Sequence, residues 1–321
     1  MSSDTEPAIA VIIPCHNESS SIQAVITGFR QYLPSSTIYV YDNNSTDDTV
    51  AKAQSAGAVV RHENRQGKGF VVRRMFADID ADVYVLVDGD DTYDPSVSPR
   101  AVERLLSENL DMVNIVRNST NSGAYRRGHA WGNVLLTYIV RLIFGRQIRD
   151  MLSGYRIFSR RYVKSFPVQS TGFEIETELT VHSMQLKMPM SEENAPYRSR
   201  AEGSSSKLST IKDGFRILIT IVHLTKDERP FFTFAIAALI LFCVSMGLGL
   251  GVVLEFMETG LVPRFPTAIM AVGIMILSFL SFVTGLILDT VSRGRRELKH
   301  LFYLSLPAPG DASGPLPRKK L

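Results

Sequence analysis

Short apolar runs alternate with longer amphipathic stretches over the first third of the chain. The runs are rich in β-branched residues, which predicts buried strands, and the stretches between them carry apolar residues at helical spacing. The predicted strands are 9–13, 38–41, 58–60, 83–87 and 111–116, and the predicted helices are 19–33, 47–56, 70–77 and 98–108. Strands that alternate with helices form a mostly parallel sheet with both faces covered. We therefore predict a Rossmann-like α/β domain.

Residues with known preferences for helix ends support these boundaries. Serines precede the first predicted helix and can cap its amino end, and Gly57 is typical of a residue that ends a helix. Ser98 and Pro99 are expected as the N-cap and first residue of the fourth helix.

Two later stretches contain no charged residue. They are residues 231–254 and 265–288, and each exceeds the roughly 20 apolar residues that cross a bilayer. A very apolar hairpin in a protein core is the alternative. Because a short polar segment, 255–264, separates the two runs, we predict a transmembrane hairpin.

The basic residues that flank the hairpin predict its orientation. Lys and Arg concentrate on the cytoplasmic side of membrane proteins, and here they precede the first run and follow the second, whereas the turn carries only Arg264. The N-terminal domain is therefore expected in the cytoplasm. The two cysteines, Cys15 and Cys243, suggest no disulfide, and the polar N-terminus shows no apolar signal-peptide core. The net charge of +3 is too small to indicate nucleic-acid binding.

The region between the α/β pattern and the hairpin contains a basic amphipathic stretch at about 129–145. We interpret it as a helix in the membrane interface, with a core helix as the alternative. The predicted organisation is a catalytic domain at 1–210, a juxtamembrane helix at 211–229, the hairpin at 230–290 and a basic, partly disordered tail at 291–321.

Two carboxylates follow directly after the predicted strand 83–87. Side chains alternate along a strand, so Asp88 and Asp90 share a face, and Gly89 between them permits close approach of a backbone or ligand. Paired carboxylate oxygens suit Mg²⁺ or Mn²⁺ shared with a diphosphate. The alternative is an acidic turn, because Asp, Gly, Thr and Pro are ordinary turn residues.

Four motifs in order carry a resemblance to a known family. The segments IIPCHNE (12–18), YDNNSTDDT (41–49), NRQGKG (64–69) and VDGDDTYDP (87–95) resemble those of the family 2 glycosyltransferases of GT-A fold. Further segments, RDMLSGYRIFSR (149–160), GFEIETEL (172–179) and YRSRAEGSSSKL (197–208), together with the hairpin, are similar to polyprenyl-phosphate glycosyltransferases of the dolichyl-phosphate mannose synthase type.

The resemblance implies a site for a nucleotide-diphosphate sugar. Asp90 would be the firmer metal ligand, with Asp88 toward the ribose and metal. The remaining donor-binding candidates are Pro14, Asn17, Glu18, Asp42, Ser45, Lys68 and Gly89. Each has a structural alternative: Asn17, Glu18 and Asp42 can cap helices, and Lys68 can be a solvated surface lysine. Some relatives carry Gln where this chain has Thr92, which leaves the metal contact of Thr92 open, and Asp91 has no assigned role.

The resemblance also implies an acceptor site for a lipid phosphate. A phosphate monoester with a second pKa of about 6 scarcely needs a general base, so the greater need is for cations that hold it. The catalytic candidates are Asp90, Asp88, Asp150, Arg117 and Arg127, and a helix-end aspartate is the alternative for Asp150. The acceptor-binding candidates are Arg117, Arg126, Arg127, His129, Ser153, Arg200 and Lys207. Residues 200–207 are interpreted as a mobile flap, with a flexible linker as the alternative.

The predicted function is transfer of a hexosyl or N-acetylhexosaminyl group from a nucleotide-diphosphate sugar to polyprenyl phosphate with inversion. UDP is preferred slightly over GDP because relatives of this type commonly use it. The alternatives are a glycosyltransferase acting on another membrane glycolipid, a processive polysaccharide synthase, and a nucleotide-binding membrane subunit without turnover. The chain lacks the Q-x-x-R-W motif of processive synthases, and no G-x-G-x-x-G follows the first strand as in dinucleotide-dependent oxidoreductases. A homo-oligomer is possible.

Overall fold

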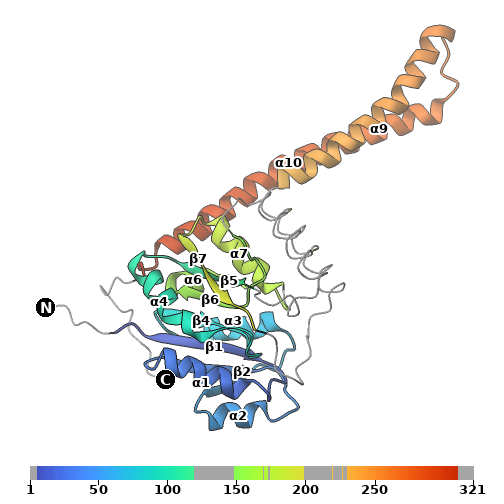
Figure 1. Ribbon diagram of the computed structural model, residues 1–321. Coiled ribbons are helices and arrows are strands. Elements are labelled where there is room, and N and C mark those ends of the chain that lie inside the picture. The colour runs from blue at the N-terminus through green and yellow to red at the C-terminus, as the bar shows by residue number, and fades with distance from the viewer. Residues whose placement is uncertain are drawn as a thin grey trace. The chain divides into compact units, whose positions relative to one another are not determined.

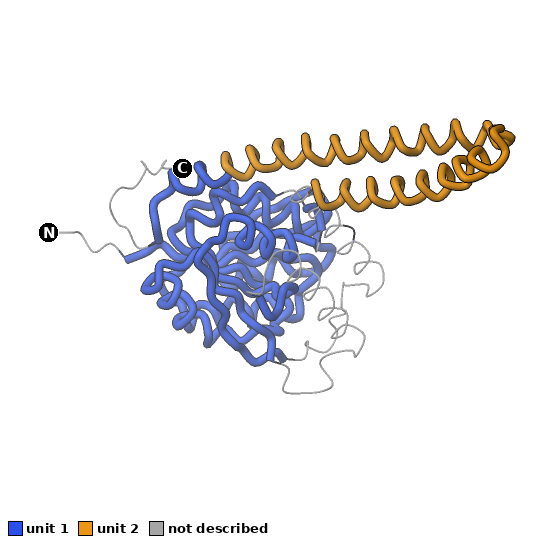
Figure 2. Tube along the Cα trace, turned by 90° about the horizontal axis from the view of Figure 1, so that it is seen from above, with its two compact units in different colours: residues 1–220, 299–321 blue, residues 221–298 orange. Residues whose placement is uncertain are grey.

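A computed structural model of the chain describes residues 6–118, 148–168, 170–172, 174–198 and 230–309, together with Ile219 and Lys226 (Figure 1). The chain divides into two compact units, residues 1–220 with 299–321 and residues 221–298 (Figure 2). The predicted interfacial helix at 129–145 lies outside the described residues, as does the predicted juxtamembrane helix except for Ile219 and Lys226.

The described part of the first unit is built on a seven-stranded sheet of order β3-β2-β1-β4-β6-β5-β7. Only the pairings of β6 are antiparallel. The strands are β1 (Ile9–Cys15), β2 (Thr37–Asp42), β3 (Val59–His62), β4 (Val83–Leu86), β5 (Met112–Asn118), β6 (Arg156–Ser159) and β7 (Met190–Pro196). The mostly parallel sheet and its first five strands are thus confirmed, and β6 and β7 are additions that the apolar pattern did not predict.

Helices connect the strands and cover the sheet. They are α1 (Ile22–Tyr32), α2 (Thr49–Ser55), α3 (Lys68–Asp78), the 3-10 turn η1 (Pro95–Val97), α4 (Ser98–Ser107), α6 (Arg160–Ser165) and α7 (Ile175–Gln185). The first four predicted helices are present, with ends that differ by a few residues, whereas α6 and α7 were not predicted. In Figure 1 they lie around the sheet as in other open α/β folds.

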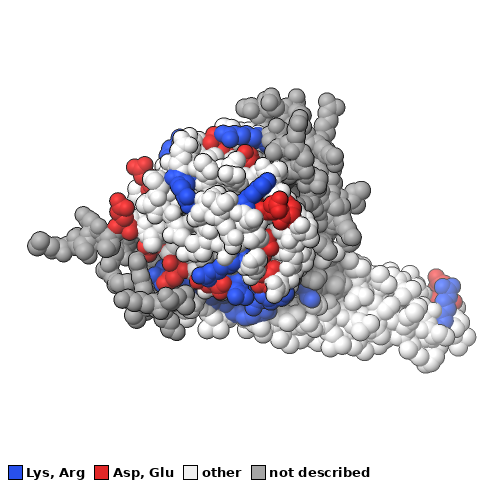
Figure 3. Space-filling view, turned by 90° about the horizontal axis from the view of Figure 1, so that it is seen from below, with Lys and Arg blue, Asp and Glu red and all other residues white. Residues whose placement is uncertain are grey.

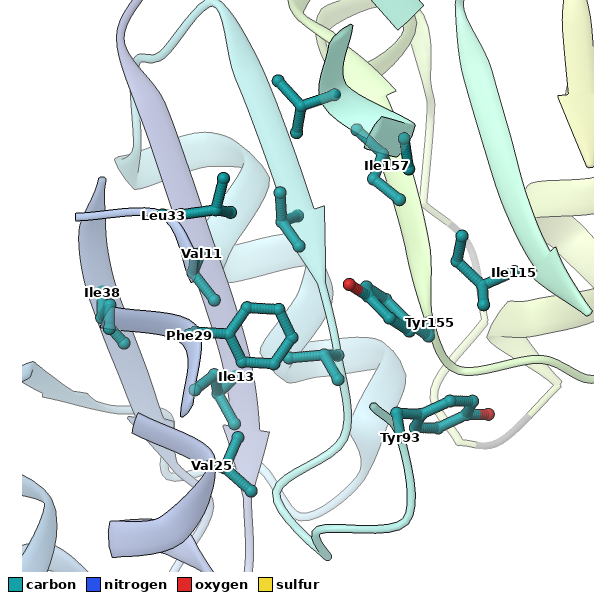
Figure 4. Close-up of a cluster of buried hydrophobic side chains, with 14 of the residues drawn as sticks. Val11, Ile13, Val25, Phe29, Leu33, Ile38, Tyr93, Ile115, Tyr155 and Ile157 are labelled. Carbon is teal, nitrogen blue, oxygen red and sulfur yellow. The ribbon is translucent and has the colours of Figure 1, made fainter. Parts of the chain in front are cut away.

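Successive side chains of β1 point to opposite faces of the sheet, and apolar residues are buried on both faces. Val11 and Ile13 belong to a cluster that includes Phe29 of α1 and Tyr155, which contact edge to face at 5.8 Å between ring centroids (Figure 4). On the other face, Phe76 of α3 packs edge to face on Tyr84 and Phe158 at about 6 Å. Burial of each such side chain stabilises the fold by about 1.5–3 kcal/mol, so the sheet edge that carries the motifs rests on a rigid core.

Two of the predicted helix caps are wrong in detail. Ser21 precedes α1, but its hydroxyl donates to the carbonyl of Gly89 at 2.7 Å and makes no capping bond. Ser98 is the first residue of α4 rather than its cap, because η1 precedes it and its hydroxyl donates to the Pro95 carbonyl at 2.6 Å. Gly57 does follow the end of α2, with a φ of 82° that favours glycine.

The second unit consists of the long antiparallel helices α9 (Pro230–Thr259) and α10 (Phe265–Leu304), the latter running on into the first unit. They lie side by side, and the hydroxyl of Ser245 donates to the Ala271 carbonyl at 2.7 Å while that of Ser278 donates to Ala238 at 2.8 Å. In Figure 3 the visible hairpin is almost uncharged except at its turn, where Arg264 pairs with Glu255. Both helices are long and apolar enough to cross a membrane.

Helix α10 continues to Leu304, well beyond the predicted span 265–288, so part of the predicted tail 291–321 is helical. Its last residues belong to the first unit, where Tyr303 donates to the fully buried carboxylate of Asp111 at 2.6 Å. Arg161 forms an ion pair with the same carboxylate at 2.8 Å, and its guanidinium lies 4.4 Å from the centre of the Tyr303 ring. The end of α10 is therefore fixed to the sheet domain by a charge-assisted network.

Candidate active site

The predicted donor residues meet at one edge of the sheet. β2, β1 and β4 are adjacent and parallel, so their carboxyl ends lie side by side. Asp42 is the last residue of β2, and Glu18 and Asp88 follow the ends of β1 and β4. This edge is where open α/β sheets bind their ligands.

The loops after β1 and β2 are bonded to each other. The amide of Asn17 donates to the Ser45 hydroxyl at 2.9 Å, and the side-chain carbonyl of Asn17 accepts from the Thr46 amide at 2.8 Å. The amide of Glu18 donates to the Thr49 hydroxyl at 2.8 Å. Asn17 and Ser45 are thus joined by a hydrogen bond, and Pro14 lies at the same strand end, partly exposed.

The carboxylate of Asp42 is buried and accepts from the Ser45 amide at 3.2 Å. The next residue, Asn43, was not predicted as part of the site. Its amide donates to the carbonyls of Glu63 and Arg65, and its carbonyl accepts from the Gly67 amide at 2.7 Å. Asn43 therefore holds the glycine-rich loop against the end of β2, and the Asn-Asn pair after the strand was the only signal for it.

The glycine-rich loop is shaped by a close approach to residues 170–171. A Cβ at Gly67 would lie 2.2 Å from the Thr171 carbonyl, and one at Gly69 would lie 2.2 Å from the Ser170 carbonyl. Only glycine fits at both positions. The loop in turn sets the position of Lys68, the first residue of α3.

Lys68 is not a solvated lysine. Its ammonium lies 2.5 Å from Oδ1 of Asp88 and 2.5 Å from Oε1 of Glu176, and its side chain is 8% exposed. Burial lowers the pKa of Lys68, but attraction to the two carboxylates outweighs this and raises the pKa above its ordinary value. Burial also raises the pKa of Glu176, with Lys68 opposing. Glu176 lies in the GFEIETEL motif, but its pairing with Lys68, 108 positions away, was not predicted.

The two acids after β4 differ in their surroundings. Asp90 is buried, and its Oδ1 accepts from the Thr92 hydroxyl at 2.6 Å and from the Thr92 amide at 3.3 Å, whereas the Asp88 side chain is 32% exposed. Thr92 thus orients Asp90. Asp91 has a φ of 56°, and burial raises the pKa of its carboxyl.

The carboxylate oxygens of Asp88 and Asp90 fit a hard divalent cation that is also bound by a ligand such as a diphosphate. Asp88 and Asp90 supply carboxylate oxygens at the sheet edge, and no group of three or more His, Cys, Asp or Glu side chains in the described part of the chain could hold a metal alone. Mg²⁺ is commonly bound in this way by one or two carboxylates plus phosphate oxygens and water. Asp88 and Asp90 would therefore supply two carboxylate ligands, and water or a diphosphate would complete the coordination of the ion.

The SGYR motif supports Asp88 from behind. A Cβ at Gly154 would lie 2.2 Å from Oδ2 of Asp88, and the Gly154 amide donates to the hydroxyl of Tyr93 at 2.8 Å. Tyr93 belongs to the acidic motif after β4, and Figure 4 shows it beside Tyr155. The two motifs are therefore packed as one unit around the Asp88 carboxylate.

Gly154→Ala is expected to lower activity by about a hundredfold, because the added methyl group pushes Asp88 away from its position, and small misplacements of reacting groups cost this much. The protein should remain folded, since the clash involves one side chain. Turnover and circular dichroism of the purified variant test this. Gly251→Ala in α9, where a Cβ meets no atom within 4 Å, is the matched control; an unchanged rate for Gly154→Ala would contradict the packing argument.

Two of the predicted catalytic residues, Arg117 and Asp150, form an ion pair. Arg117 Nε lies 2.7 Å from Asp150 Oδ2, and Nη2 lies 2.8 Å from Oδ1. Arg117 also lies 5.6 Å from the centre of the Tyr197 ring. This bidentate geometry fixes the plane of the guanidinium at the end of β5.

Ser153, another predicted acceptor residue, faces inward. It is fully buried, and its hydroxyl donates to the Ile115 carbonyl at 2.6 Å. This geometry favours a role in holding the loop after Asp150 rather than contact with a ligand. The other acceptor candidates, Arg126, Arg127, His129, Arg200 and Lys207, lie outside the described residues.

Arg156, a buried cation beneath the site, was not among the predicted site residues. It is fully buried and donates to the carbonyls of Ser153 at 3.0 Å, Met151 at 2.5 Å and Glu176 at 3.1 Å, and to the Thr180 hydroxyl at 2.9 Å. Burial lowers its pKa. Arg156 thus ties the loop that follows Asp150 to the helix that carries Glu176.

Comparison with known proteins identifies the family. Residues 10–166 match the family described as "Glycosyl transferase family 2", and this segment runs from the second residue of β1 past β6 and contains both acids after β4. The chain belongs to glycosyl transferase family 2. Its sheet is that of the GT-A fold, as predicted.

Relatives among known proteins extend over different parts of the chain. An uncharacterised protein of Shigella flexneri is 55% identical over 155 residues, which is 48% of this chain and 95% of the relative. Glycosyltransferase AglJ of Haloferax volcanii is 28% identical over 300 residues, 92% of this chain and 98% of the relative. A dolichyl-phosphate hexose transferase of the same organism is 26% identical over 69% of this chain and 95% of its own length.

Among solved structures, this glycosyltransferase is similar to glucosyl-3-phosphoglycerate synthase from Mycobacterium tuberculosis in complex with Mn²⁺, UDP-glucose and phosphoglyceric acid. The TM-score is 0.58 with 23% identity, over 68% of this chain and 80% of the other. This likeness shows the shared fold. In the neighbour, a divalent cation and a nucleotide sugar are bound together.

Proposed function

We propose that this family 2 glycosyltransferase moves a monosaccharide from a nucleotide-diphosphate sugar to polyprenyl phosphate, with inversion at the anomeric carbon. The observation that carries the proposal is the Asp88–Asp90 pair with Lys68 at the carboxyl edge of the sheet, in a chain that also has two helices long and apolar enough to cross a membrane. The names of two relatives, a dolichyl-phosphate hexose transferase and a dolichol-phosphate mannosyltransferase, support the acceptor class.

The donor would lie across the ends of β2, β1 and β4. The joined loops carrying Asn17 and Ser45, together with Asp42, would receive the nucleoside, while Asp88 and Asp90 would hold Mg²⁺ or Mn²⁺ with the diphosphate. A cation held by these two carboxylates would supply positive charge opposite the departing diphosphate. Thr92 keeps Asp90 oriented for this task. The UDP-glucose bound by the structural neighbour supports UDP over GDP as the nucleotide.

The acceptor phosphate would approach from the side of Asp150. It is already a nucleophile at neutral pH, since its second pKa is about 6, so the chain must mainly hold it against the repulsion of the donor phosphates. Arg117 is a fixed guanidinium for this purpose, oriented by Asp150. Arg126, Arg127, His129, Arg200 and Lys207 are proposed as further acceptor ligands on the family resemblance.

The hairpin α9–α10 would anchor the enzyme in the bilayer with the catalytic domain in the cytoplasm, as the flanking basic residues predict. A lipid phosphate in the cytoplasmic leaflet is then an accessible acceptor. Cysteine accessibility in intact cells tests the orientation: a cysteine introduced at exposed Glu103 should be protected from a membrane-impermeant reagent, and labelling of that residue would place the domain on the other side.

A panel of radiolabelled UDP- and GDP-sugars, presented with polyprenyl phosphate and Mn²⁺ to the purified full-length protein, tests the proposed reaction. We expect one sugar of the panel to be transferred to the lipid, and each product molecule should carry a single sugar residue. Label in a polymer or another glycolipid would support a different acceptor, and nucleotide binding without any product would support a non-catalytic subunit.

Arg117→Gln is expected to raise the KM for polyprenyl phosphate by about tenfold, because a charge-assisted phosphate contact is lost. The donor KM should change by less than about twofold. Initial rates measured with each substrate varied in turn separate these effects. Arg149→Gln removes a nearby but exposed arginine that pairs with Glu192 and serves as the control. An equal rise in both KM values would argue against an acceptor role for Arg117.

A further inference from the structure

Lys68 occupies the place beside Asp88 that a divalent cation would need. Its ammonium lies 2.5 Å from Asp88 Oδ1, and the lysine side chain is almost fully buried while Asp88 is partly exposed. Two cations at one carboxylate oxygen repel each other strongly, because little solvent screens like charges in a buried site. Binding of a metal at Asp88 therefore requires that Lys68 give up this contact.

Glu176 provides Lys68 with a second carboxylate that does not depend on Asp88. Its Oε1 lies 2.5 Å from the lysine ammonium, and its side chain is 7% exposed. Its backbone is fixed as well, because its carbonyl accepts from the buried guanidinium of Arg156. Gly67 and Gly69 hold the start of α3 against residues 170–171. The lysine can therefore leave Asp88 while it stays beside the site.

We propose that Lys68 is an internal counter-ion of Asp88 that the divalent cation displaces, and that Glu176 retains the displaced ammonium beside the donor diphosphate. This inference rests on the proposed function, because it takes Asp88 and Asp90 as the metal ligands. Glu176 is then a positioning residue: it acts through Lys68. Exchange of one cation for another at Asp88 leaves the carboxylate compensated in both states, which avoids an unpaired partly buried charge before the donor arrives.

Substitutions of Lys68 and of Glu176 are expected to change the affinity for Mn²⁺ in opposite directions. Without the Lys68 charge, Mn²⁺ alone meets no competing cation at Asp88. Without the Glu176 charge, the ammonium is held by Asp88 more strongly, and Mn²⁺ displaces it less easily. A purely structural ion triad predicts instead that both substitutions weaken the site together.

The test measures binding of Mn²⁺ alone to detergent-purified full-length protein, from the loss of the free-ion electron paramagnetic resonance signal. Lys68→Met should bind Mn²⁺ about fivefold more tightly than the wild type, and Glu176→Gln about fivefold more weakly. Lys68→Gln is a second variant should Lys68→Met fail to fold. With Mn²⁺ present, both lysine variants should bind UDP more weakly, because the ammonium is no longer there to meet the diphosphate.

Asp90→Asn separates failure of this inference from failure of the proposed function. If Asp90→Asn abolishes Mn²⁺ binding while the Lys68 and Glu176 variants bind Mn²⁺ like the wild type, or shift in the same direction, the displacement proposal is overturned and the metal assignment stands. If Asp90→Asn binds Mn²⁺ as the wild type does, the assignment of the metal to this acidic pair is itself wrong.

Discussion

Asp90→Asn is expected to reduce sugar transfer by about a thousandfold or more, equivalent to ~4 kcal/mol of transition-state stabilisation. The substitution keeps the shape of the side chain and removes the charge that would hold a cation against the donor diphosphate. Asp90 is buried and already bonded to Thr92, so an amide at this position leaves the turn intact. Single-turnover rates with saturating donor and acceptor, together with circular dichroism, measure the two effects separately.

Asp80→Asn is the matched control for this prediction. Asp80 precedes β4 and Asp90 follows it, so the two acids lie at opposite ends of the same strand. Asp80 pairs with Arg160 and its side chain is 47% exposed, and loss of such a surface pair has little effect. Full activity of Asp90→Asn, or an equal loss in Asp80→Asn, would contradict the role of the acidic pair.

Arg156→Met is expected to give the largest loss of stability among substitutions near the site, about 3 kcal/mol or more in the free energy of unfolding. The methionine fills much of the volume but leaves the carbonyls of Ser153, Met151 and Glu176 without the donor they have now. Arg156→Lys should recover only part of the loss, because an ammonium cannot reproduce the planar fork. Thermal unfolding in detergent, followed by scanning fluorimetry, ranks the variants.

Arg160→Met provides the comparison for Arg156. The two arginines are four residues apart, but the Arg160 side chain is 26% exposed and bonds to Asp80 at the surface. We expect its unfolding temperature to change by a few degrees at most, since an exposed ion pair contributes less than about 1 kcal/mol. If Arg156→Met unfolds at the same temperature as Arg160→Met, the buried network does not hold the site together as described.

The first half of the sheet could be predicted because its strands are continuous apolar runs. β1 and β4 are buried on both faces, and such strands carry a strong signal. β6 was missed because it is four residues long and begins with the fully buried Arg156. β7 was missed because its sequence, MSEENAP, is mostly polar and only partly buried. A pattern of apolar residues cannot report strands whose polar groups are satisfied by distant partners.

In the candidate site, too, some residues could be predicted from the sequence and others could not. The acids and the glycine-rich loop could be read from local motifs, since their chemistry follows from residue type and position at strand ends. The partners that hold them could not, because Lys68 and Glu176 are 108 positions apart, and Arg117 and Asp150 are 33 apart. Thr92, Asn43 and Gly154 contribute through contacts that exist only in the folded chain.

The central claim is tested most directly by one paired transfer assay. The purified full-length protein is given its radiolabelled nucleotide sugar and either polyprenyl phosphate or the corresponding polyprenol, each with Mn²⁺ and with the cation removed by a chelator. Labelled lipid is expected only with the phosphorylated acceptor and the cation present. Equal labelling of the polyprenol, or undiminished transfer to polyprenyl phosphate after chelation, would contradict it.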